Sequence, residues 1–68
     1  MVKIGSVLKE LRRTEKLTQQ ELADKLHISR VNYTRYELDY VYPDYDTLIT
    51  IADFYGVSLD YIFSREKY

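Results

Sequence analysis

Four side chains that suit hydrogen bonding and methyl contacts lie close together in the middle of the chain: Arg30, Val31, Thr34 and Arg35. At roughly 100° per residue, a helix places these four and Leu38 within about 140° of one side. The opposite side of that helix holds Tyr33, Tyr36 and Glu37. A guanidinium group binds paired acceptors such as the guanine edge, and the methyl groups of Val31 and Thr34 match the methyl group of thymine. The pattern favours contact with the base edges of a duplex, and an ordinary solvated face is the alternative.

The residues that catalysis or metal binding needs are missing from this sequence. It has no cysteine, one histidine and no glycine-rich phosphate loop, and no carboxylate pair lies in an evident cleft. Nothing could therefore act as a nucleophile or as a metal cage. We expect a protein without enzymatic activity, cofactor or metal, and we interpret His27 as a turn residue rather than a ligand or a pH switch.

The totals indicate one ordinary globular domain. A length of 68 residues allows a single modest core, and 46% hydrophobic with 31% charged residues is a normal globular balance. No apolar run approaches the ~20 residues of a membrane span, and the opening segment lacks the uninterrupted apolar stretch of a signal peptide. We therefore expect one soluble, cytoplasmic domain over residues 1–68.

The charges are divided unevenly along the chain. The net charge is -1, yet the first 36 residues hold eight basic and four acidic side chains, and the others hold two and seven. A positive front and a negative back orient a molecule toward a polyanion. Because small domains also divide their charges by chance, this signal alone decides nothing about nucleic-acid binding.

The pattern of apolar residues and caps predicts an all-α fold of five short helices. The first covers about residues 4–15. A fourth begins at Pro43 and Asp44, and a fifth begins after Ser58. The buried stripes of these three are expected to be Ile4, Val7, Leu8 and Leu11; Leu48, Ile51, Ala52 and Tyr55; and Leu59, Ile62 and Phe63. The last five residues, 64–68, are expected to fray.

Two helices in the middle of the chain are separated by only a few residues. Thr18 and Glu21 have the spacing of a capping box, which starts the second helix. This helix is expected to bury Leu22, Ala23 and Leu26. It ends near His27, and the hydroxyl of Ser29 is an N-cap for the third helix. Because the junction is so short, the two helices must cross steeply.

This arrangement resembles the XRE-like (Cro-type, phage-repressor) helix-turn-helix family over most of the chain. The residues that carry the resemblance are Leu17-Thr18-Gln19-Gln20-Glu21-Leu22-Ala23, Arg35-Tyr36-Glu37 with Pro43, Thr47-Leu48-Ile49, and Ala52-Asp53-Phe54-Tyr55-Gly56-Val57-Ser58-Leu59-Asp60-Tyr61. Each segment alone is a weak signal, but together they are highly specific. The resemblance implies a compact five-helix, lambda-repressor-like domain with its helix-turn-helix at about residues 18–38.

The resemblance also implies which residues meet double-stranded DNA. The second helix would lie across the phosphates, and the third would enter the major groove. The base-reading positions are Arg30, Val31, Thr34 and Arg35. The positions for the DNA backbone are Gln19, Asn32, Arg12 and Tyr40. In the family, the residue at Gln19 binds a phosphate and braces the first reading residue, which favours Gln19 and Arg30 as neighbours.

Arg12 and Glu37 match a pair that forms a partly buried salt bridge in many members of the family. This pair would join the first helix to the third. Since desolvation can cancel the attraction, its expected role is to set the angle of the third helix. The unused N–H groups of Arg12 would be free for a phosphate.

The sequence departs from the family at three helix ends, where glycine is common. Lys16, His27 and Asp39 stand there, and each is expected to adopt the left-handed conformation that closes a helix. Lysine is the least comfortable of the three.

A second departure lies between Asp39 and Pro43, where the family commonly carries Lys or Arg for phosphates. The loop here is Tyr40-Val41-Tyr42, with Tyr45 close by. Tyrosine hydroxyls can bind phosphates, but the three tyrosines could equally form an interface or pack on the domain's own surface.

These observations favour a transcriptional regulator, most simply a repressor, that binds a pseudo-palindromic operator as a homodimer. The expected dimer surface is the last helix, around Leu59, Tyr61, Ile62 and Phe63. The alternative is a protein-binding helix-turn-helix module, such as an antitoxin or a bridging factor, whose acidic second half grips a partner protein.

Overall fold

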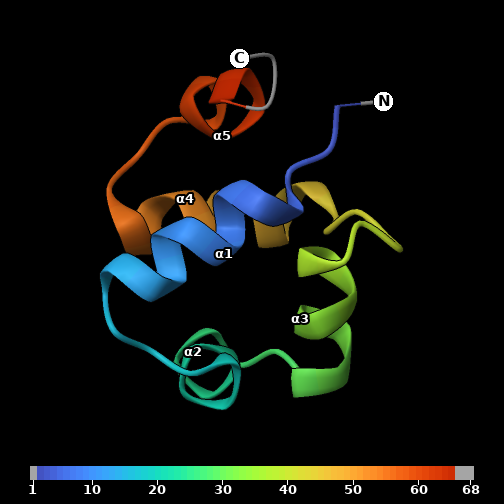
Figure 1. Ribbon diagram of the computed structural model, residues 1–68, viewed down its shortest axis with the longest axis vertical. Helices are drawn as coiled ribbons and strands as arrows, with labels where there is room; N and C mark the ends of the chain where they lie inside the picture. The colour runs from blue at the N-terminus through green and yellow to red at the C-terminus, as the bar shows by residue number, and fades with distance from the viewer. Residues whose placement is uncertain (1, 66–68) are drawn as a thin grey trace.

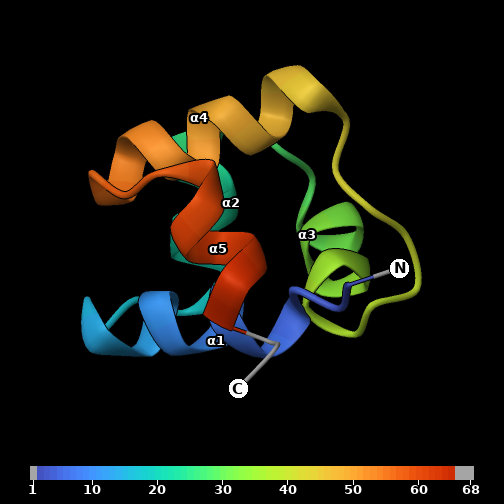
Figure 2. The ribbon, with the colours of Figure 1, turned by 90° about the horizontal axis from the view of Figure 1, so that it is seen from above.

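The computed structural model describes residues 2–65, which form five α-helices. They are α1 (Gly5–Thr14), α2 (Gln19–Leu26), α3 (Arg30–Glu37), α4 (Tyr45–Tyr55) and α5 (Leu59–Arg65). Helices α1 and α4 lie across the middle of the molecule, and α2 and α5 lie at opposite ends (Figure 1). From above, α5 lies between α1 and α4 (Figure 2), and it contacts both. The all-α fold of five helices is confirmed.

Four of these helices begin at a side chain that accepts a hydrogen bond from the backbone N–H three residues later. The N-caps are Thr18, Ser29, Asp44 and Ser58, at 3.0, 3.1, 3.0 and 3.0 Å. At Thr18 the capping box is complete, because Glu21 Oε1 also accepts from the Thr18 N–H at 2.8 Å. Within residues 2–65, none of the helices combines the length and apolar character needed to cross a membrane.

One or two residues after each of the helices α1 to α4 ends, the chain has a residue in the left-handed conformation. These residues are Lys16, His27, Asp39 and Gly56, with φ of 60°, 57°, 61° and 67°. After each of them, the next N–H donates to the carbonyl five residues back, as Leu17 does to Arg12 at 3.2 Å. The hydrogen bonds satisfy carbonyl groups that the helix end leaves unpaired. The left-handed conformation expected at the three non-glycine positions is confirmed.

One apolar core joins all five helices. Its buried members are Ile4, Leu8, Leu22, Ala23, Leu26, Tyr33, Leu48, Ile51, Ala52 and Ile62. Helix α3 contributes a single fully buried side chain, Tyr33. A buried aromatic ring removes about 150–250 Å² from water, enough to hold a short helix in place. The rest of α3 is therefore left for other contacts.

The start of α1 is held by a residue from the end of α3. No side chain of α1 itself caps its first turn. Instead, Asp39 Oδ1 accepts from the backbone N–H of Ile4 at 3.1 Å and of Gly5 at 2.9 Å. The approach is so close that a Cβ on Gly5 would overlap the carbonyl oxygen of Glu37. These contacts fix where α3 ends relative to α1.

Helix α5 corrects one residue of the dimer surface that was expected on the last helix. Ile62 is fully buried in the chain's own core, so it cannot lie on a surface. Leu59 and Phe63 are partly buried and pack against that core, and Phe63 stacks on Tyr42 with ring centroids 6.4 Å apart. Only Tyr61, 36% exposed, stays on the outside. The stripe of Leu59, Ile62 and Phe63 that was expected to be buried thus packs on the core.

The expectation that residues 64–68 fray is wrong for the first two of them. Helix α5 includes Ser64 and Arg65 and ends at the latter. The other three residues of that segment lie outside the described residues.

Candidate nucleic-acid interface

Helices α2 and α3 are joined by a turn of three residues. His27 ends α2 in the left-handed conformation, and Ser29 caps α3. Between them, Ile28 is partly buried against the core and anchors the turn. In Figure 1, α2 is seen nearly end-on while α3 is seen from the side, so the two axes cross steeply. The turn therefore places α3 at one side of the molecule, with α2 next to the start of α3.

The outward side of α3 is open. Arg30 and Arg35 are exposed, and Val31 is 63% exposed. A hollow in the surface is lined by Arg30, Val31, Thr34, Arg35, Leu38 and Tyr40. All four residues expected to read bases line this one hollow, and Leu38 and Tyr40 extend it beyond the end of the helix. This side of α3 thus faces away from the core.

The inward side of α3 matches the expected division of the helix. Tyr33 is fully buried and Tyr36 is half-buried, and their rings meet edge to face with centroids 6.4 Å apart. Two aromatic rings on one side hold the helix against the core and leave the opposite side outward.

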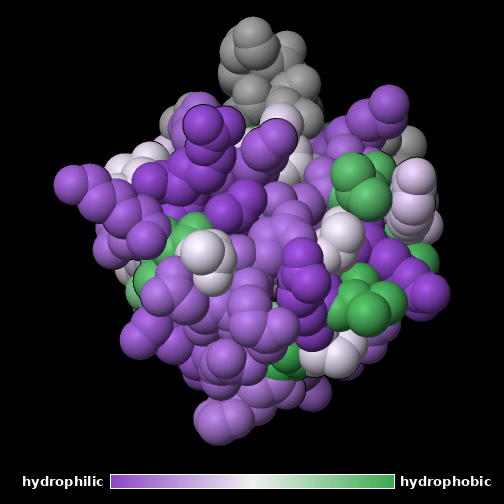
Figure 3. Space-filling model, turned by 60° about the horizontal axis from the view of Figure 1, so that its bottom comes forward, coloured by the Kyte–Doolittle hydropathy of each residue, from purple (hydrophilic) through white to green (hydrophobic). Residues whose placement is uncertain are grey.

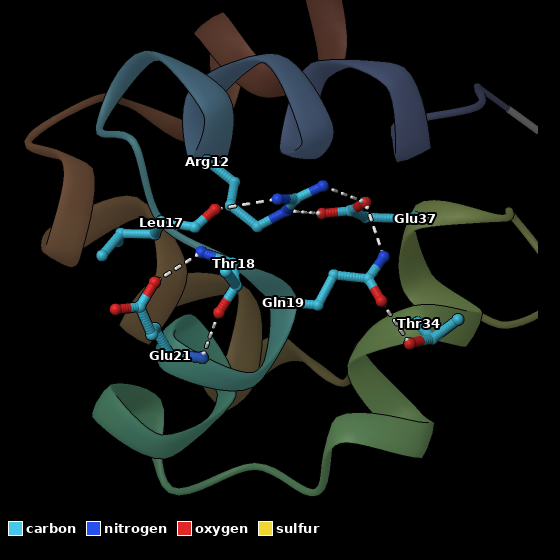
Figure 4. Close-up of polar contacts among 7 residues, drawn as sticks. All are labelled: Arg12, Leu17, Thr18, Gln19, Glu21, Thr34 and Glu37. Atoms are coloured by element: carbon cyan, nitrogen blue, oxygen red, sulfur yellow. Dashed lines mark hydrogen bonds and ion pairs between the residues drawn. The ribbon is translucent and has the colours of Figure 1, made fainter.

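A hydrogen-bonded network behind α3 connects it to α1 and α2 (Figure 4). Arg12 Nε donates to Glu37 Oε2 at 2.7 Å, and Arg12 Nη2 donates to Glu37 Oε1 at 3.2 Å. The third donor, Arg12 Nη1, reaches the carbonyl oxygen of Leu17 at 2.8 Å. Gln19 Nε2 donates to Glu37 Oε1 at 3.0 Å. Finally, Thr34 Oγ1 donates to Gln19 Oε1 at 2.8 Å. The network thus runs from α1 through the end of α3 to the side chain of Thr34.

The carboxyl group of Glu37, at the centre of this network, stays ionised. Burial raises the pKa of Glu37, but hydrogen bonds, chiefly from Arg12, outweigh it, so the pKa lies below its usual value. Burial, together with the negative charge of Glu37, raises the pKa of Tyr33. At neutral pH, the site therefore holds one carboxylate, one guanidinium and a neutral phenol.

The network bears on two expected contacts, those of Gln19 and Arg12. The side chain of Gln19 is hydrogen-bonded to Thr34 and Glu37, and Thr34 lies one turn after Arg30 on the same side of α3. Arg12 was expected to keep N–H groups for a phosphate, but its side chain is only 12% exposed and three of its nitrogens donate within the domain. Three of its five N–H groups are thus used, and the other two belong to a side chain with little exposed surface. Asn32 is exposed near the start of α3, as its expected place requires.

Tyr40, Tyr42 and Tyr45 differ in exposure, although Tyr40 and Tyr42 line one hollow together. Tyr42 is half-buried and stacks on Phe63, so it packs on the domain's own surface. Tyr40 is 73% exposed and lines the hollow beside Arg30 and the other residues named above. Tyr45 is 69% exposed at the start of α4. The three residues therefore do not form one compact patch of buried rings.

The surface around α2 is mainly hydrophilic. Figure 3 brings the end of the molecule that holds α2 forward, and its apolar residues form separate patches between hydrophilic ones.

Part of the acidic excess in the second half of the chain belongs to helix starts. Asp44 caps α4, and Asp46 and Asp60 lie in the first turns of α4 and α5. Negative charge at a helix start stabilises the helix, so these carboxylates have a structural role.

The short turn, the steep crossing of α2 and α3, and the open side of α3 together define a helix-turn-helix domain. A family model described as "Helix-turn-helix domain" matches residues 5–67. The chain therefore belongs to this helix-turn-helix family, in agreement with the resemblance to XRE-like proteins. It is not a family of enzymes.

Several curated bacterial proteins are similar to this chain. The uncharacterized HTH-type transcriptional regulator YqaE of Bacillus subtilis (strain 168) is 54% identical over 60 residues, which are 88% of this chain and 52% of that protein. The HTH-type transcriptional regulator ImmR of the same organism is 42% identical over 64 residues, 94% of this chain and 50% of that protein. The HTH-type transcriptional activator BcrR of Enterococcus faecalis is 35% identical over 60 residues, 88% of this chain and 29% of that protein. The chain spans about half the length of the first two relatives.

Proposed function

We propose that this chain is the DNA-reading domain of a transcriptional regulator, most simply a repressor. Helix α3 enters the major groove of a short operator. The observation that carries this proposal is the open side of α3, where Arg30 and Arg35 are exposed and form no ion pair with any residue from 2 to 64. An unpaired guanidinium on a rigid helix can bind the O6 and N7 atoms of guanine with two hydrogen bonds.

The neighbouring side chains support the same assignment. Val31 and Thr34 place methyl groups between the two arginines, where they can meet the methyl group of thymine. Tyr40 lines the hollow and Asn32 is exposed on α3, so both can bind phosphates, and Gln19 opens α2 where a helix start favours an anion. Base-edge contacts thus lie at the centre, with phosphate contacts around them.

We further propose that the protein binds as a homodimer. One domain reads few base pairs, whereas a two-fold pair of α3 helices reads two half-sites ~34 Å apart and multiplies the discrimination. Of the four residues first expected at the dimer surface, Tyr61 is the one that stays exposed. Light scattering of the protein alone and with DNA measures the stoichiometry, and one protein per operator would contradict the dimer.

The test of the whole proposal is a selection of bound sites from a random duplex pool at near-physiological salt. We expect one enriched motif with two related half-sites, and no enrichment would overturn the proposal. In single-site measurements, Arg30→Ala and Arg35→Ala should each relax the preference at one base pair by about 1–3 kcal/mol. Arg13→Ala is the matched control, because it removes the same charge from an exposed position on α1.

A second candidate function is a protein-binding module. The exposed apolar side chains of Leu38, Tyr40 and Val41 favour it, because they lie within four residues of the chain and are 54%, 73% and 48% exposed. Ionic strength separates the two functions. DNA binding weakens steeply as the salt concentration rises, because the release of counterions from the phosphates then gains less free energy. Binding through an apolar protein interface does not weaken in this way.

A further inference from the structure

The side chain of Thr34 is both at the proposed reading surface and tied to the domain's internal network. It lines the hollow with Arg30 and Arg35 on one side, and its hydroxyl contacts Gln19 at 2.8 Å on the other. A threonine hydroxyl normally rotates, so it donates or accepts a hydrogen bond as its partner requires. Here the network removes that freedom.

The direction of each hydrogen bond follows from Glu37. Its carboxylate is paired with Arg12 and can only accept hydrogen bonds. The side-chain amide of Gln19, 3.0 Å away, must therefore turn its NH2 group toward Glu37. The opposite orientation would set the amide oxygen against a carboxylate oxygen, two acceptors with no proton between them.

This orientation leaves only the carbonyl oxygen of Gln19 facing Thr34. A carbonyl oxygen only accepts, so the Thr34 hydroxyl must donate its single proton to Gln19. What Thr34 can offer on its open side is a lone pair and a methyl group. A base that brings an acceptor to this hydroxyl finds no proton, unless the bond to Gln19 breaks.

The major-groove edge of every base pair carries one exocyclic amino group and one keto oxygen. Adenine and cytosine present the amino groups, and guanine and thymine present the keto oxygens at the equivalent places. Resting on the proposed function, we propose that Thr34 is a specificity-determining residue that selects the amino group of the base pair it contacts and rejects a keto oxygen at that place. The network from Arg12 to Gln19 sets this choice by fixing the hydroxyl as an acceptor.

The test begins with the selected operator and the full chain. A selection repeated with Thr34→Ala identifies the base pair that Thr34 contacts. Dissociation constants are then measured for operators that lack either the amino group or the keto oxygen at that pair. Purine replaces adenine and 2-pyrimidinone replaces cytosine to delete the amino group; 2-aminopurine replaces guanine and 5-methyl-2-pyrimidinone replaces thymine to delete the keto oxygen. Weaker base pairing affects both proteins alike, so the difference between native protein and variant isolates the contact.

Deleting the amino group should weaken binding of the native protein about tenfold more than it weakens binding of Thr34→Ala. Deleting the keto oxygen should affect both proteins equally. Thr34→Ser keeps the hydroxyl and should behave as the native protein does. Gln19→Ala frees the hydroxyl to rotate, so the distinction between amino and keto groups should disappear.

Three results would overturn the inference: coupling of Thr34 to the keto oxygen, coupling to neither group, or an unchanged selection with Thr34→Ala. Any of these, with a selected operator in hand, leaves the proposed function standing. A chain that selects no operator overturns the proposed function and the inference with it. Circular dichroism of each variant shows that a loss of coupling does not come from unfolding.

Discussion

Arg12 and Glu37 join α1 to the last residue of α3 through two hydrogen bonds, of which the shorter, from Nε to Oε2, is 2.7 Å. The pair is largely enclosed, with side chains 12% and 3% exposed. A buried pair of this kind contributes little net stability. Removing one partner nevertheless costs much stability, because the charge that is left behind is buried without a partner. Because the pair joins α1 to the end of α3, we expect it to set the angle of α3 against the rest of the domain.

Arg12→Ala should therefore lower both stability and DNA affinity. Removing the partner of a buried carboxylate costs about 3–5 kcal/mol, which is much of the stability of a domain this small. Urea unfolding and operator binding measure the two losses. Arg12→Met combined with Glu37→Leu removes both charges and should recover much of the stability. Unchanged unfolding together with unchanged binding by Arg12→Ala would contradict the role given to the pair.

Acid should destabilise the protein through Glu37. Because its pKa is lower in the folded state than in the unfolded chain, its contribution is present above the ordinary value of about 4.3. That contribution is lost as the pH falls through the folded pKa. Unfolding free energies measured from pH 7 down to pH 3 should decrease, and Glu37→Gln should make the decrease shallower. The lowered pKa values of Glu21 and Asp44 act in the same direction, so a part of the slope persists in the variant. An identical slope in both proteins would exclude Glu37 as a source.

The cap that Asp39 provides to α1 can be separated from its backbone conformation. Asp39→Ala removes the acceptor for Ile4 and Gly5 and leaves a side chain at φ 61°, so a loss of about 1–3 kcal/mol is expected. Asp39→Asn keeps an acceptor and tolerates the left-handed region, and should lose least. Asp39→Gly loses the cap but not the conformation and should fall between. Thermal melting ranks the three, and alanine as the mildest change would refute the cap.

Gly5→Ala should destabilise the domain although alanine is the better helix former. The added Cβ would overlap the Glu37 carbonyl oxygen and lie 2.7 Å from Asp39 Oδ2. Overpacking of this kind costs about 1–3 kcal/mol, more than the gain in helix propensity of about 1 kcal/mol. Because α3 must shift to make room, operator affinity should fall as well. Ser6→Ala, at the next and exposed position, is the control and should change the melting temperature little.

Lys16→Gly should stabilise the protein by about 0.5–1 kcal/mol, since φ of 60° suits glycine and not lysine. For a domain of this size, that raises the melting temperature by roughly 2–8 °C. Lys9→Gly, an exposed position inside α1, is the matched control and should destabilise by about 1 kcal/mol. Equal effects of the two substitutions would show that the conformation at Lys16 carries no strain.

The sequence by itself determined where the helices begin and end. The caps at Thr18, Ser29 and Ser58 join groups three residues apart, so each depends only on its own segment. The outward side of α3 is also a local property, because 100° per residue sets which side chains share a face. The left-handed ends at Lys16, His27 and Asp39 followed from the family resemblance, and short-range hydrogen bonds close them.

Only the tertiary structure decided how these helices are held together. Asp39 and Gly5 meet across 34 residues of chain, and Gln19 and Thr34 meet across 15. The stripe of Leu59, Ile62 and Phe63 faces the core as its spacing predicts, but only the tertiary structure brings Phe63 against Tyr42. Contacts between distant segments depend on how helices pack as rigid bodies, and a helical period contains no information about the partner that each side will meet.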